Sequence, residues 1–554
     1  MNGAELMVKC LENEGVEYIF GIPGEENLAF LEALRSSSIQ LILTRHEQAA
    51  GFMAATYGRL TGKPGVCLAT LGPGATNFVT SVSYALLGGM PCLFITGQKP
   101  IKTSKQGRFQ IINVVSMMAP ITKMTRQIVG ADSIATLTRE AFRVAIQEKS
   151  GPVHLELPED IAEEQTTVTP FPVTQVASAC APEKAIKEAG AIIQQAKNPL
   201  LLIAAASNHQ HKIGQALEHF IEQTGIYFFS TQMGKGAANE FHSRCLGTAA
   251  LSDHDYLHCA IGKADVIINI GHDVVEKPPF FMKRTGVKVI HISYFQAVFD
   301  EVYFPQHEVI GDIADSMQRL TALIAPASAS ASDTLAGDGY FDLLKKEIDK
   351  NVYKRTLPAT FPYTPQQLTR VLCELMDKDS ILSLDNGMYK IWFARNYRSM
   401  NSYSVLLDNA LATMGAGLPV AIAAKMLFPQ KKVVAICGDG GFMMNSQELE
   451  TAIRLQLDLT ILLLRDDGLG MIKWKQGGMG LLDFGLDFGN PDFVKYAESY
   501  GAKGYRAVDQ DQLAEVLEHC LNTPGVHLIE LPIDYAENES VLIEELKSKT
   551  CLLG

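Results

Sequence analysis

The chain has few of the features that mark membrane-inserted, nucleic-acid-binding or disulfide-rich proteins. It has no uninterrupted apolar run of about 18 residues, so we expect no transmembrane helix. Its 48 Lys and Arg residues are outnumbered by 61 Asp and Glu residues, and the net charge of −13 argues against a general nucleic-acid binder. The ten cysteines include no C-x-x-C pair and several lie in apolar runs, which indicates reduced thiols in a cytoplasmic protein.

Several common catalytic and targeting motifs are missing as well. The chain contains no G-x-S-x-G and no H-E-x-x-H, which argues against the serine hydrolases and zinc proteases that carry them. The Gly-rich turn at Gly72–Asn77 lacks G-x-G-x-x-G spacing, so a dinucleotide fingerprint is not supported. The N-terminal segment reads as an amphipathic helix and not as a basic region followed by an apolar one, so we expect no signal peptide.

What the chain has is a regular alternation of short apolar runs and helical patterns. Hydrophobic residues make up 47% and charged residues 20%, which is ordinary for a soluble globular protein. Continuous apolar strands between helices predict α/β architecture with parallel, doubly wound sheets covered on both faces. The strands are predicted at residues 41–46, 65–70, 92–96, 153–157, 199–206, 265–271, 287–293, 380–384, 433–437, 459–464 and 526–531.

Two segments rich in small and polar residues, 165–184 and 325–338, read as linkers. They predict three domains, at 1–164, 185–324 and 339–554. Residues 60–78 and 427–445 share the order of helix end, turn, buried strand, Gly-rich turn and helix. The first and third domains are therefore expected to be two copies of one design.

The strongest chemical signal is the turn Gly438-Asp439-Gly440-Gly441 after an apolar strand. Glycines and a following helix N-terminus favour a phosphate, but an Asp in the turn would repel it unless the Asp holds a divalent cation. Asp466 follows the next strand and is expected beside Asp439, because ligands bind at the carboxyl ends of parallel strands. The alternative is a pair of ordinary acidic turns.

Three further strand-end turns, Gly72–Asn77, Arg45-His46-Glu47 and Gly21–Gly24, are weak signals when taken singly. A Glu that enters a helix, for example, is often only a favourable first-turn charge. Together with the Asp-containing turn, however, they resemble the thiamine-diphosphate-dependent acetolactate synthase (acetohydroxyacid synthase) family, in its catalytic subunit. The resemblance covers nearly the whole chain and includes FGIPGEEN, TRHEQAAGFMAATYGRLTGKPGV, LATLGPGATN, GRFQ, GPVHLELPED, ATMGAGLP and GDGGFMMNSQELETA.

The resemblance implies pyrimidine-binding, central and diphosphate-binding domains, with thiamine diphosphate between the first domain of one subunit and the third of its partner. It implies that Glu47 activates the aminopyrimidine ring, that Gln110 lies near the substrate, and that Met414 bends the cofactor. The implied Mg²⁺ ligands are Asp439, Asp466 and the Gly468 carbonyl. The other implied cofactor-binding residues are Gly24, Pro73, Asn77, Asn386, Gly387, Met388, Tyr389, Gly438, Gly440, Gly441, Leu469, Gly470 and Met471.

The implied reaction decarboxylates pyruvate and joins the two-carbon unit to a second 2-oxo acid, pyruvate or 2-oxobutyrate, which gives 2-acetolactate and CO₂. Alternatives are a 2-hydroxyacyl-CoA lyase, a sulfoacetaldehyde acetyltransferase or a pyruvate oxidase-like enzyme of the same superfamily. A flavin or nicotinamide oxidoreductase and a non-catalytic regulatory relative belong to other classes. Retention of Glu47 together with both Asp ligands argues against the regulatory relative.

Departures from the family pattern indicate the catabolic type. Arg465-Asp466 replaces the usual Asn-Asn, and residues 272–280, HDVVEKPPF, lack the Arg of the flavin-binding segment, so the sequence argues against FAD while leaving it open. Asn386–Tyr389 replaces the usual Gly-Gln-His, which predicts diphosphate contacts through the backbone. We expect a cytoplasmic homodimer or homotetramer in branched-chain amino acid or acetoin metabolism, with no nucleic-acid or membrane partner. The sequence does not decide whether there is a regulatory subunit.

Overall fold

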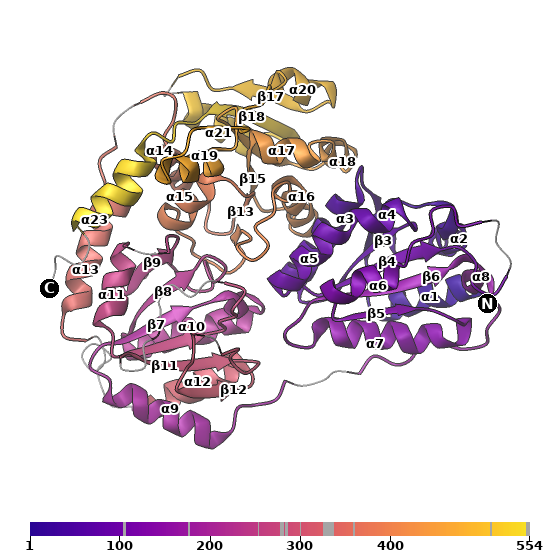
Figure 1. The fold of residues 1–554 in the computed structure, drawn as a ribbon, viewed down its shortest axis with the longest axis horizontal. Coiled ribbons are helices and arrows are strands. Elements are labelled where there is room, and N and C mark those ends of the chain that lie inside the picture. Colours follow the sequence, from indigo (N-terminus) through magenta and orange to yellow (C-terminus); the bar gives the residue numbers. More distant parts are fainter. Residues whose placement is uncertain are drawn as a thin grey trace. The chain divides into compact units, whose positions relative to one another are not determined.

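The computed structural model describes residues 1–103, 107–174, 178–252, 254–276, 282, 286–299, 301–324, 337–357, 360–509 and 512–549. Part of each predicted linker, at 175–177 and 325–336, lies outside the described residues, as do positions 277–280 of the segment HDVVEKPPF. The chain forms two compact units (Figure 1). Unit 1 comprises residues 1–177, 415–429 and 443–457, and unit 2 comprises residues 178–414, 430–442 and 458–554.

Unit 1 contains a six-stranded parallel sheet in the order β2–β1–β3–β4–β6–β5. Its strands are β1 (Tyr18–Gly21), β2 (Gln40–Leu43), β3 (Gly65–Ala69), β4 (Cys92–Gln98), β5 (Met124–Gln127) and β6 (Pro152–Pro158). β3, β4 and β6 are buried along their whole length, as the continuous apolar runs predict. The helices of unit 1 are α1 (Gly3–Asn13), α2 (Leu28–Arg35), α3 (Glu47–Thr61), α4 (Pro73–Asn77), α5 (Val79–Gly88), α6 (Val114–Met118), α7 (Ile134–Ile146), α8 (Glu159–Glu163), α16 (Gly417–Leu427) and α18 (Glu448–Arg454).

Unit 2 contains two such sheets, and the first has the order β12–β11–β10–β7–β8–β9. Its strands are β7 (Pro199–Ile203), β8 (Tyr227–Thr231), β9 (Cys245–Ala249), β10 (Val266–Ile270), β11 (Lys288–Ser293) and β12 (His307–Ile310). Successive residues of β7 face opposite cores: Leu201 and Ile203 pack with α9, α10 and α12, whereas Leu200 and Leu202 pack with α11 and α13. This strand order places the topological switch point between β7 and β10. The helices are α9 (Glu183–Gln195), α10 (His211–Thr224), α11 (Tyr256–Lys263), α12 (Ile313–Ile324) and α13 (Tyr340–Ile348).

The second sheet of unit 2 has the order β14–β13–β15–β16–β18–β17. Its strands are β13 (Ile381–Leu384), β14 (Val405–Leu406), β15 (Val433–Gly438), β16 (Leu459–Arg465), β17 (Lys503–Arg506) and β18 (Val526–Pro532). When its strands are numbered along the chain, the order is the same as in the sheet of unit 1, which confirms the repeated design. The accompanying helices are α14 (Pro365–Leu375), α15 (Met388–Asn396), α17 (Asp439–Asn445), α19 (Gly470–Gly478), α20 (Phe493–Ser499), α21 (Gln512–Asn522), α22 (Glu537–Glu539) and α23 (Glu545–Lys549).

All eleven predicted strands are present, and the three sheets confirm the α/β prediction. No described helix is long and apolar enough to cross a membrane. Free thiols are found at Cys10, Cys67, Cys92, Cys180, Cys245, Cys373, Cys437 and Cys520. Cys259 is disulfide-bonded, so the prediction of reduced thiols is wrong at that position. Spacing along the chain could not reveal this bond, because the fold decides which thiols meet.

Candidate active site

Two neighbouring strands of unit 2 end in the acidic turns that stand out in the sequence. β15 ends at Gly438 and α17 begins at Asp439, while β16 ends at Arg465 directly before Asp466. Gly438 is the register partner of Leu464 in the parallel ladder, so the two turns leave the sheet side by side at its carboxyl edge. This edge is where open α/β sheets bind their ligands.

A cavity of about 270 Å³ opens at these turns. It is lined by Asn386, Gly387, Met388, Tyr389, Lys390, Ala412, Met414, Gly438, Asp439, Gly440, Gly441, Asp466, Gly468, Leu469, Gly470, Met471, Ile472 and Tyr535. Every cofactor or metal residue predicted in the C-terminal part of the sequence is in this lining. The segments that carry them lie far apart in the chain, and the fold of unit 2 brings them together.

Of the two aspartates of the cavity, Asp439 is buried and Asp466 is half-buried, and they lie close enough to interact. Asp439 is 1% exposed, and burial raises the pKa of its carboxyl. Burial and the facing charge of Asp439 raise the pKa of Asp466 to about 7. A divalent cation between the two carboxylates would relieve this repulsion, so the donor set fits Mg²⁺. No cluster of three or more His, Cys, Asp or Glu side chains suited to a metal occurs among the described residues, so backbone, phosphate and water oxygens would complete the shell.

Hydrogen bonds hold the Asp439 carboxylate in place. Its Oδ2 accepts from the Asp467 N–H at 2.8 Å and from Asn490 Nδ2 at 2.8 Å, and its Oδ1 accepts from the Gly440 N–H at 2.9 Å. Three donors, from the two strand-end turns and the loop that carries Asn490, thus fix one predicted metal ligand. The arrangement orients the carboxylate before any cation binds.

The cavity also offers an anion site, because the N-termini of α15 and α19 open into it. Gly387, the N-cap of α15, and Gly470, the first residue of α19, both line the cavity. Free N–H groups and the helix dipole at such ends favour phosphate groups. A Cβ at position 470 would stand 2.3 Å from the Asp466 Oδ2, so any larger residue there would displace that carboxylate. At Gly441 a Cβ would stand 2.6 Å from the Asp385 Oδ2.

Two hydrogen-bonded side chains of unit 2 fix the loop that leads to Met414. Asn386 Nδ2 donates to the Thr413 carbonyl at 2.6 Å, directly before Met414. Lys390 Nζ donates to Asn386 Oδ1 at 2.6 Å and to the Asp408 carbonyl at 3.0 Å. Lys390 is buried, and it was not predicted as a site residue. The feature that could have indicated it is a single charged residue within the apolar helical run MYKIWFA.

In unit 1, Glu47 begins α3, whose N-cap His46 accepts from the Gln48 N–H through Nδ1. Glu47 is 9% exposed, and Asn77 Nδ2 donates to its Oε2 at 2.9 Å. A Cβ at Gly74 would stand 3.3 Å from the Glu47 Oε1, so the Gly-rich turn also borders this carboxylate. The predicted catalytic Glu47 and cofactor residue Asn77 are therefore in direct contact.

Gln110, Gly24 and Pro73 complete the predicted group in unit 1. Pro73 begins α4 at the turn that borders Glu47, and a Cβ at Gly72 would stand 2.7 Å from the Gln110 carbonyl oxygen. Gln110 has a positive φ of 59°, an uncommon backbone conformation for a residue other than glycine. Gly24 lies against Thr70, where a Cβ would stand 2.4 Å from the Thr70 Cβ. The residues predicted in the N-terminal part thus meet around one Gly-rich turn and the strand that leads into it.

Three models of thiamine pyrophosphate enzymes match the chain: the N-terminal TPP binding domain at residues 1–117, the central domain at 186–320, and the C-terminal TPP binding domain at 385–531. The acetolactate synthase of Bacillus subtilis is 32% identical over 98% of this chain and 95% of its own length. The catabolic acetolactate synthase of Raoultella terrigena is 31% identical over 97% of this chain and 96% of its own length. A probable acetolactate synthase large subunit of Methanococcus aeolicus is 32% identical over 96% and 92%.

The chain belongs to the acetolactate synthase family. The match to the three thiamine pyrophosphate enzyme domains confirms the family and the architecture expected from the motifs. The site residues fall into two groups, one around Glu47 in unit 1 and one around the cavity of unit 2. Their individual roles in this acetolactate synthase family member stay predictions.

Several residues at the site of this family member were not predicted from the sequence. Besides Lys390, the cavity is lined by Ala412, Ile472 and Tyr535, and Asn490 donates to the Asp439 carboxylate. Tyr535 follows the last strand and Asn490 lies in a loop, so neither belongs to a strand-end turn of recognisable pattern. Their position depends on tertiary packing, which no local motif signals.

Proposed function

We propose that this protein is an acetolactate synthase dependent on thiamine diphosphate and Mg²⁺. It decarboxylates pyruvate and joins the two-carbon unit to a second 2-oxo acid, which gives 2-acetolactate and CO₂. The single observation that supports this most is the cavity of unit 2, whose lining contains every predicted metal and cofactor residue of that part of the chain. The relatives named acetolactate synthases extend over nearly the whole chain.

Each group of residues that lines the cavity of unit 2 has its own role in this proposal. When bound, thiamine diphosphate supplies the carbon nucleophile and the electron sink for decarboxylation. Asp439, Asp466 and the Gly468 carbonyl hold Mg²⁺, and the N-termini of α15 and α19 receive the diphosphate. Met414 supports the cofactor from the loop that Asn386 and Lys390 fix.

Glu47 carries the proton transfer in this proposal. Its carboxylate exchanges a proton with the aminopyrimidine nitrogen, and Asn77 holds it in one orientation through the 2.9 Å hydrogen bond to Oε2. The burial of Glu47 keeps bulk water from competing for that hydrogen bond. Gln110, whose carbonyl lies against the same Gly-rich turn, contacts the substrate.

We further propose that the complete site forms between two copies of the chain, with Glu47 of one subunit facing the cavity of the other. The described lining of the cavity comes from unit 2, whereas Glu47 belongs to unit 1. Co-expression of Glu47→Gln and Asp439→Ala chains with different tags tests this point. Mixed dimers then contain one intact site, and the pool regains about a quarter of wild-type activity. A pool as inactive as either variant alone would contradict a shared site.

We infer that FAD is not a cofactor. At the switch point of the first sheet of unit 2, the Ala206 N–H donates to the Gly271 carbonyl at 3.0 Å, across the ends of β7 and β10. The buried Glu276 carboxylate accepts from the Met233 N–H at 3.0 Å and from Thr231 Oγ1 at 2.7 Å, so these two donors are already occupied. Burial raises the pKa of Glu276 to about 7. A phosphate would meet this acidic side chain, so the residues do not fit the cofactor.

Product analysis tests the reaction directly. Purified protein with thiamine diphosphate, Mg²⁺ and pyruvate is expected to release CO₂ and to form 2-acetolactate, with 2-aceto-2-hydroxybutyrate appearing when 2-oxobutyrate is added. Product formation stops when the cofactor or the cation is left out. Consumption of pyruvate without formation of acetolactate would overturn the proposal in favour of another superfamily member. Cytoplasmic location and a catabolic role stay predictions.

A further inference from the structure

A second cavity, of about 290 Å³, lies within unit 2 and shares no residue with the candidate active site. It lies among α14, the C-terminal end of α15, the π-helix η5 (Asp349–Tyr353) and the loop before β9. Its lining consists of Phe241, Val352, Tyr353, Arg355, Leu357, Gln366, Thr369, Arg370, Cys373, Glu374, Asn396 and Arg398. Its volume is at the lower end of small-molecule pockets.

The lining of this second cavity is strongly basic, and we call it the arginine cavity. It contains the three guanidinium groups of Arg355, Arg370 and Arg398 and one carboxylate, that of the exposed Glu374. Arg355 Nη1 is paired with Glu545 Oε2 at 2.7 Å. In the part of the chain that the structure describes, neither Arg370 nor Arg398 forms an ion pair with an acidic side chain. Arg370 Nη2 donates to the Arg355 carbonyl, a neutral acceptor, so an anion would supply the negative charge that both half-buried guanidinium groups lack.

Arg398 is held rigidly in the wall of the cavity. Its guanidinium carbon lies 4.0 Å from the centre of the Phe241 ring and 4.7 Å from that of the Tyr353 ring. Both rings line the same cavity. Cation–π stacking fixes the plane of the guanidinium group and leaves its N–H groups free to donate in that plane.

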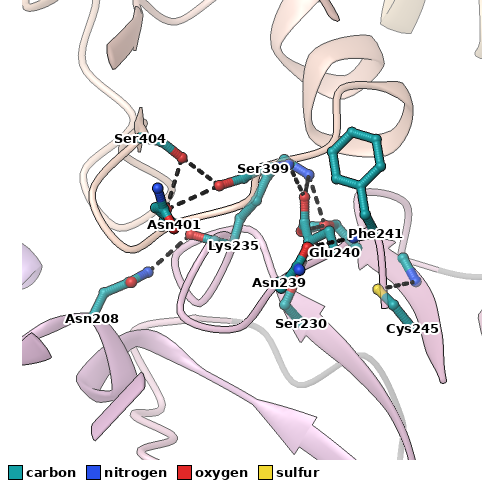
Figure 2. Close-up of polar contacts among 12 residues, drawn as sticks. Asn208, Ser230, Lys235, Asn239, Glu240, Phe241, Cys245, Ser399, Asn401 and Ser404 are labelled. Carbon is teal, nitrogen blue, oxygen red and sulfur yellow. Dashed lines mark hydrogen bonds and ion pairs between the residues drawn. The ribbon is translucent and has the colours of Figure 1, made fainter. Parts of the chain in front are cut away.

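A buried carboxylate fixes the two chain segments that carry this stack, as Figure 2 shows. Glu240 Oε2 pairs with Lys235 Nζ at 2.7 Å and accepts from the Ser399 N–H at 2.8 Å. Glu240 precedes Phe241 and Ser399 follows Arg398, so the hydrogen bond between Ser399 and Glu240 joins the two segments that carry the stack. The side chains of Lys235 and Glu240 are each 2% exposed. Such preorganisation lowers the entropy cost of binding a ligand.

The arginine cavity also presents hydrogen-bond acceptors. Gln366 is 3% exposed, its Nε2 donates to Glu537 Oε2 at 2.6 Å, and its Oε1 has no partner among the described residues. Asn396 Oδ1 is likewise buried without a partner in that part of the chain. Buried acceptors without donors are costly, so a ligand that donates to them would be favoured.

We propose that the arginine cavity binds a small organic anion that carries a hydroxyl or amino group beside its carboxylate or phosphate group. The anionic oxygens bind Arg370 and Arg398, and the hydroxyl or amino hydrogens bind Gln366 Oε1 and Asn396 Oδ1. The planar forks of the two guanidinium groups suit carboxylate and phosphate oxygens equally. This site is separate from the reaction centre and holds a ligand other than substrate.

Isothermal titration of the enzyme saturated with thiamine diphosphate and Mg²⁺ tests the proposal, because phosphate then cannot occupy the cofactor cavity. The probes are L-malate, inorganic phosphate and uncharged glycerol. We expect saturable binding of malate, phosphate or both, and none of glycerol. Binding of malate alone assigns a carboxylate ligand, and binding of phosphate alone assigns a phosphate ester.

Matched variants locate the binding. Arg398→Gln and Arg370→Gln should each weaken it about tenfold or more, the effect of losing one charge-assisted contact. Arg319→Gln, at an arginine of α12 paired with Asp315, should leave it unchanged. An unchanged cofactor affinity shows that each variant is folded, and Arg370→Gln serves alone if removal of the stacked Arg398 unfolds the chain. Absence of saturable binding by either anion, or equal binding in the variants, would overturn the proposal.

Discussion

Replacement of Gly470 by Ala tests how closely the predicted metal site is packed. The added Cβ would stand 2.3 Å from the Asp466 Oδ2, whereas an ordinary contact is 3.4 Å or more. The carboxylate must therefore move by about 1 Å, which is half of a metal–oxygen distance of about 2.0 Å. Loss of one charged ligand contact costs about 1.5–3 kcal/mol, which corresponds to roughly 10- to 150-fold weaker binding of thiamine diphosphate with Mg²⁺.

The same helix offers a matched control. Gly477 also lies in α19, and a Cβ there would meet nothing within 4 Å. Gly477→Ala should bind the cofactor normally and gain up to about 1 kcal/mol in stability from higher helix propensity. Titration calorimetry gives both affinities, and thermal unfolding reports stability. Cofactor affinity of Gly470→Ala within twofold of wild type, in a folded protein, would refute the packing argument.

Three more predictions concern the cavity loop and the buried polar groups. Met414→Ala should lower kcat about tenfold or more while cofactor affinity changes less. Met479→Ala, at an exposed methionine, is the control and should change neither quantity. Equal kcat values in the two variants would count against the role of Met414. Burial lowers the pKa of His154 from 6.5 to about 3, so the unfolding free energy should fall as pH falls below about 6.5, by up to about 1.4 kcal/mol per pH unit, and His154→Leu should flatten that slope in urea titrations. Lys235→Met leaves the Glu240 carboxylate buried without its ion-pair partner and should lower the free energy of unfolding by about 3–5 kcal/mol. The double variant Lys235→Met/Glu240→Gln should be less destabilised than Lys235→Met. A double variant that is less stable than Lys235→Met would contradict a stabilising ion pair between Lys235 and Glu240.

The sequence predicts the interior of this fold better than its edges. All eleven expected strands are present, because a strand buried on both faces must be a continuous apolar run. Seven strands were not predicted: β1, β5, β8, β9, β12, β14 and β17. Five of them, β5, β9, β12, β14 and β17, are sheet edges, where one side of the strand is unpaired. β1 and β8 lie inside their sheets but have only four and five residues, too short a run to stand out in the sequence. β14 has only two residues, too few for any periodicity.

The candidate site likewise has features that the sequence predicts and features that it does not. The turns at strand ends were predictable because parallel strands align their carboxyl ends, and this alone places Asp439 beside Asp466. The pairing of Glu47 with Asn77, and the fixing of the Met414 loop by Lys390, depend on side-chain orientations that no spacing encodes. The disulfide at Cys259 and the arginine cavity depend in the same way on tertiary packing.

The central claim is that the Glu47 carboxylate activates a cofactor held by the cavity of unit 2, and Glu47→Gln tests it most directly. Acetolactate formation from pyruvate is measured as acetoin after acidification, alongside the affinity for thiamine diphosphate with Mg²⁺. We predict that wild-type protein forms acetolactate, and that Glu47→Gln binds the cofactor but turns over at least about 100-fold more slowly. An unchanged turnover number in Glu47→Gln, or a wild-type protein that leaves pyruvate untouched in the presence of both cofactors, would contradict the account.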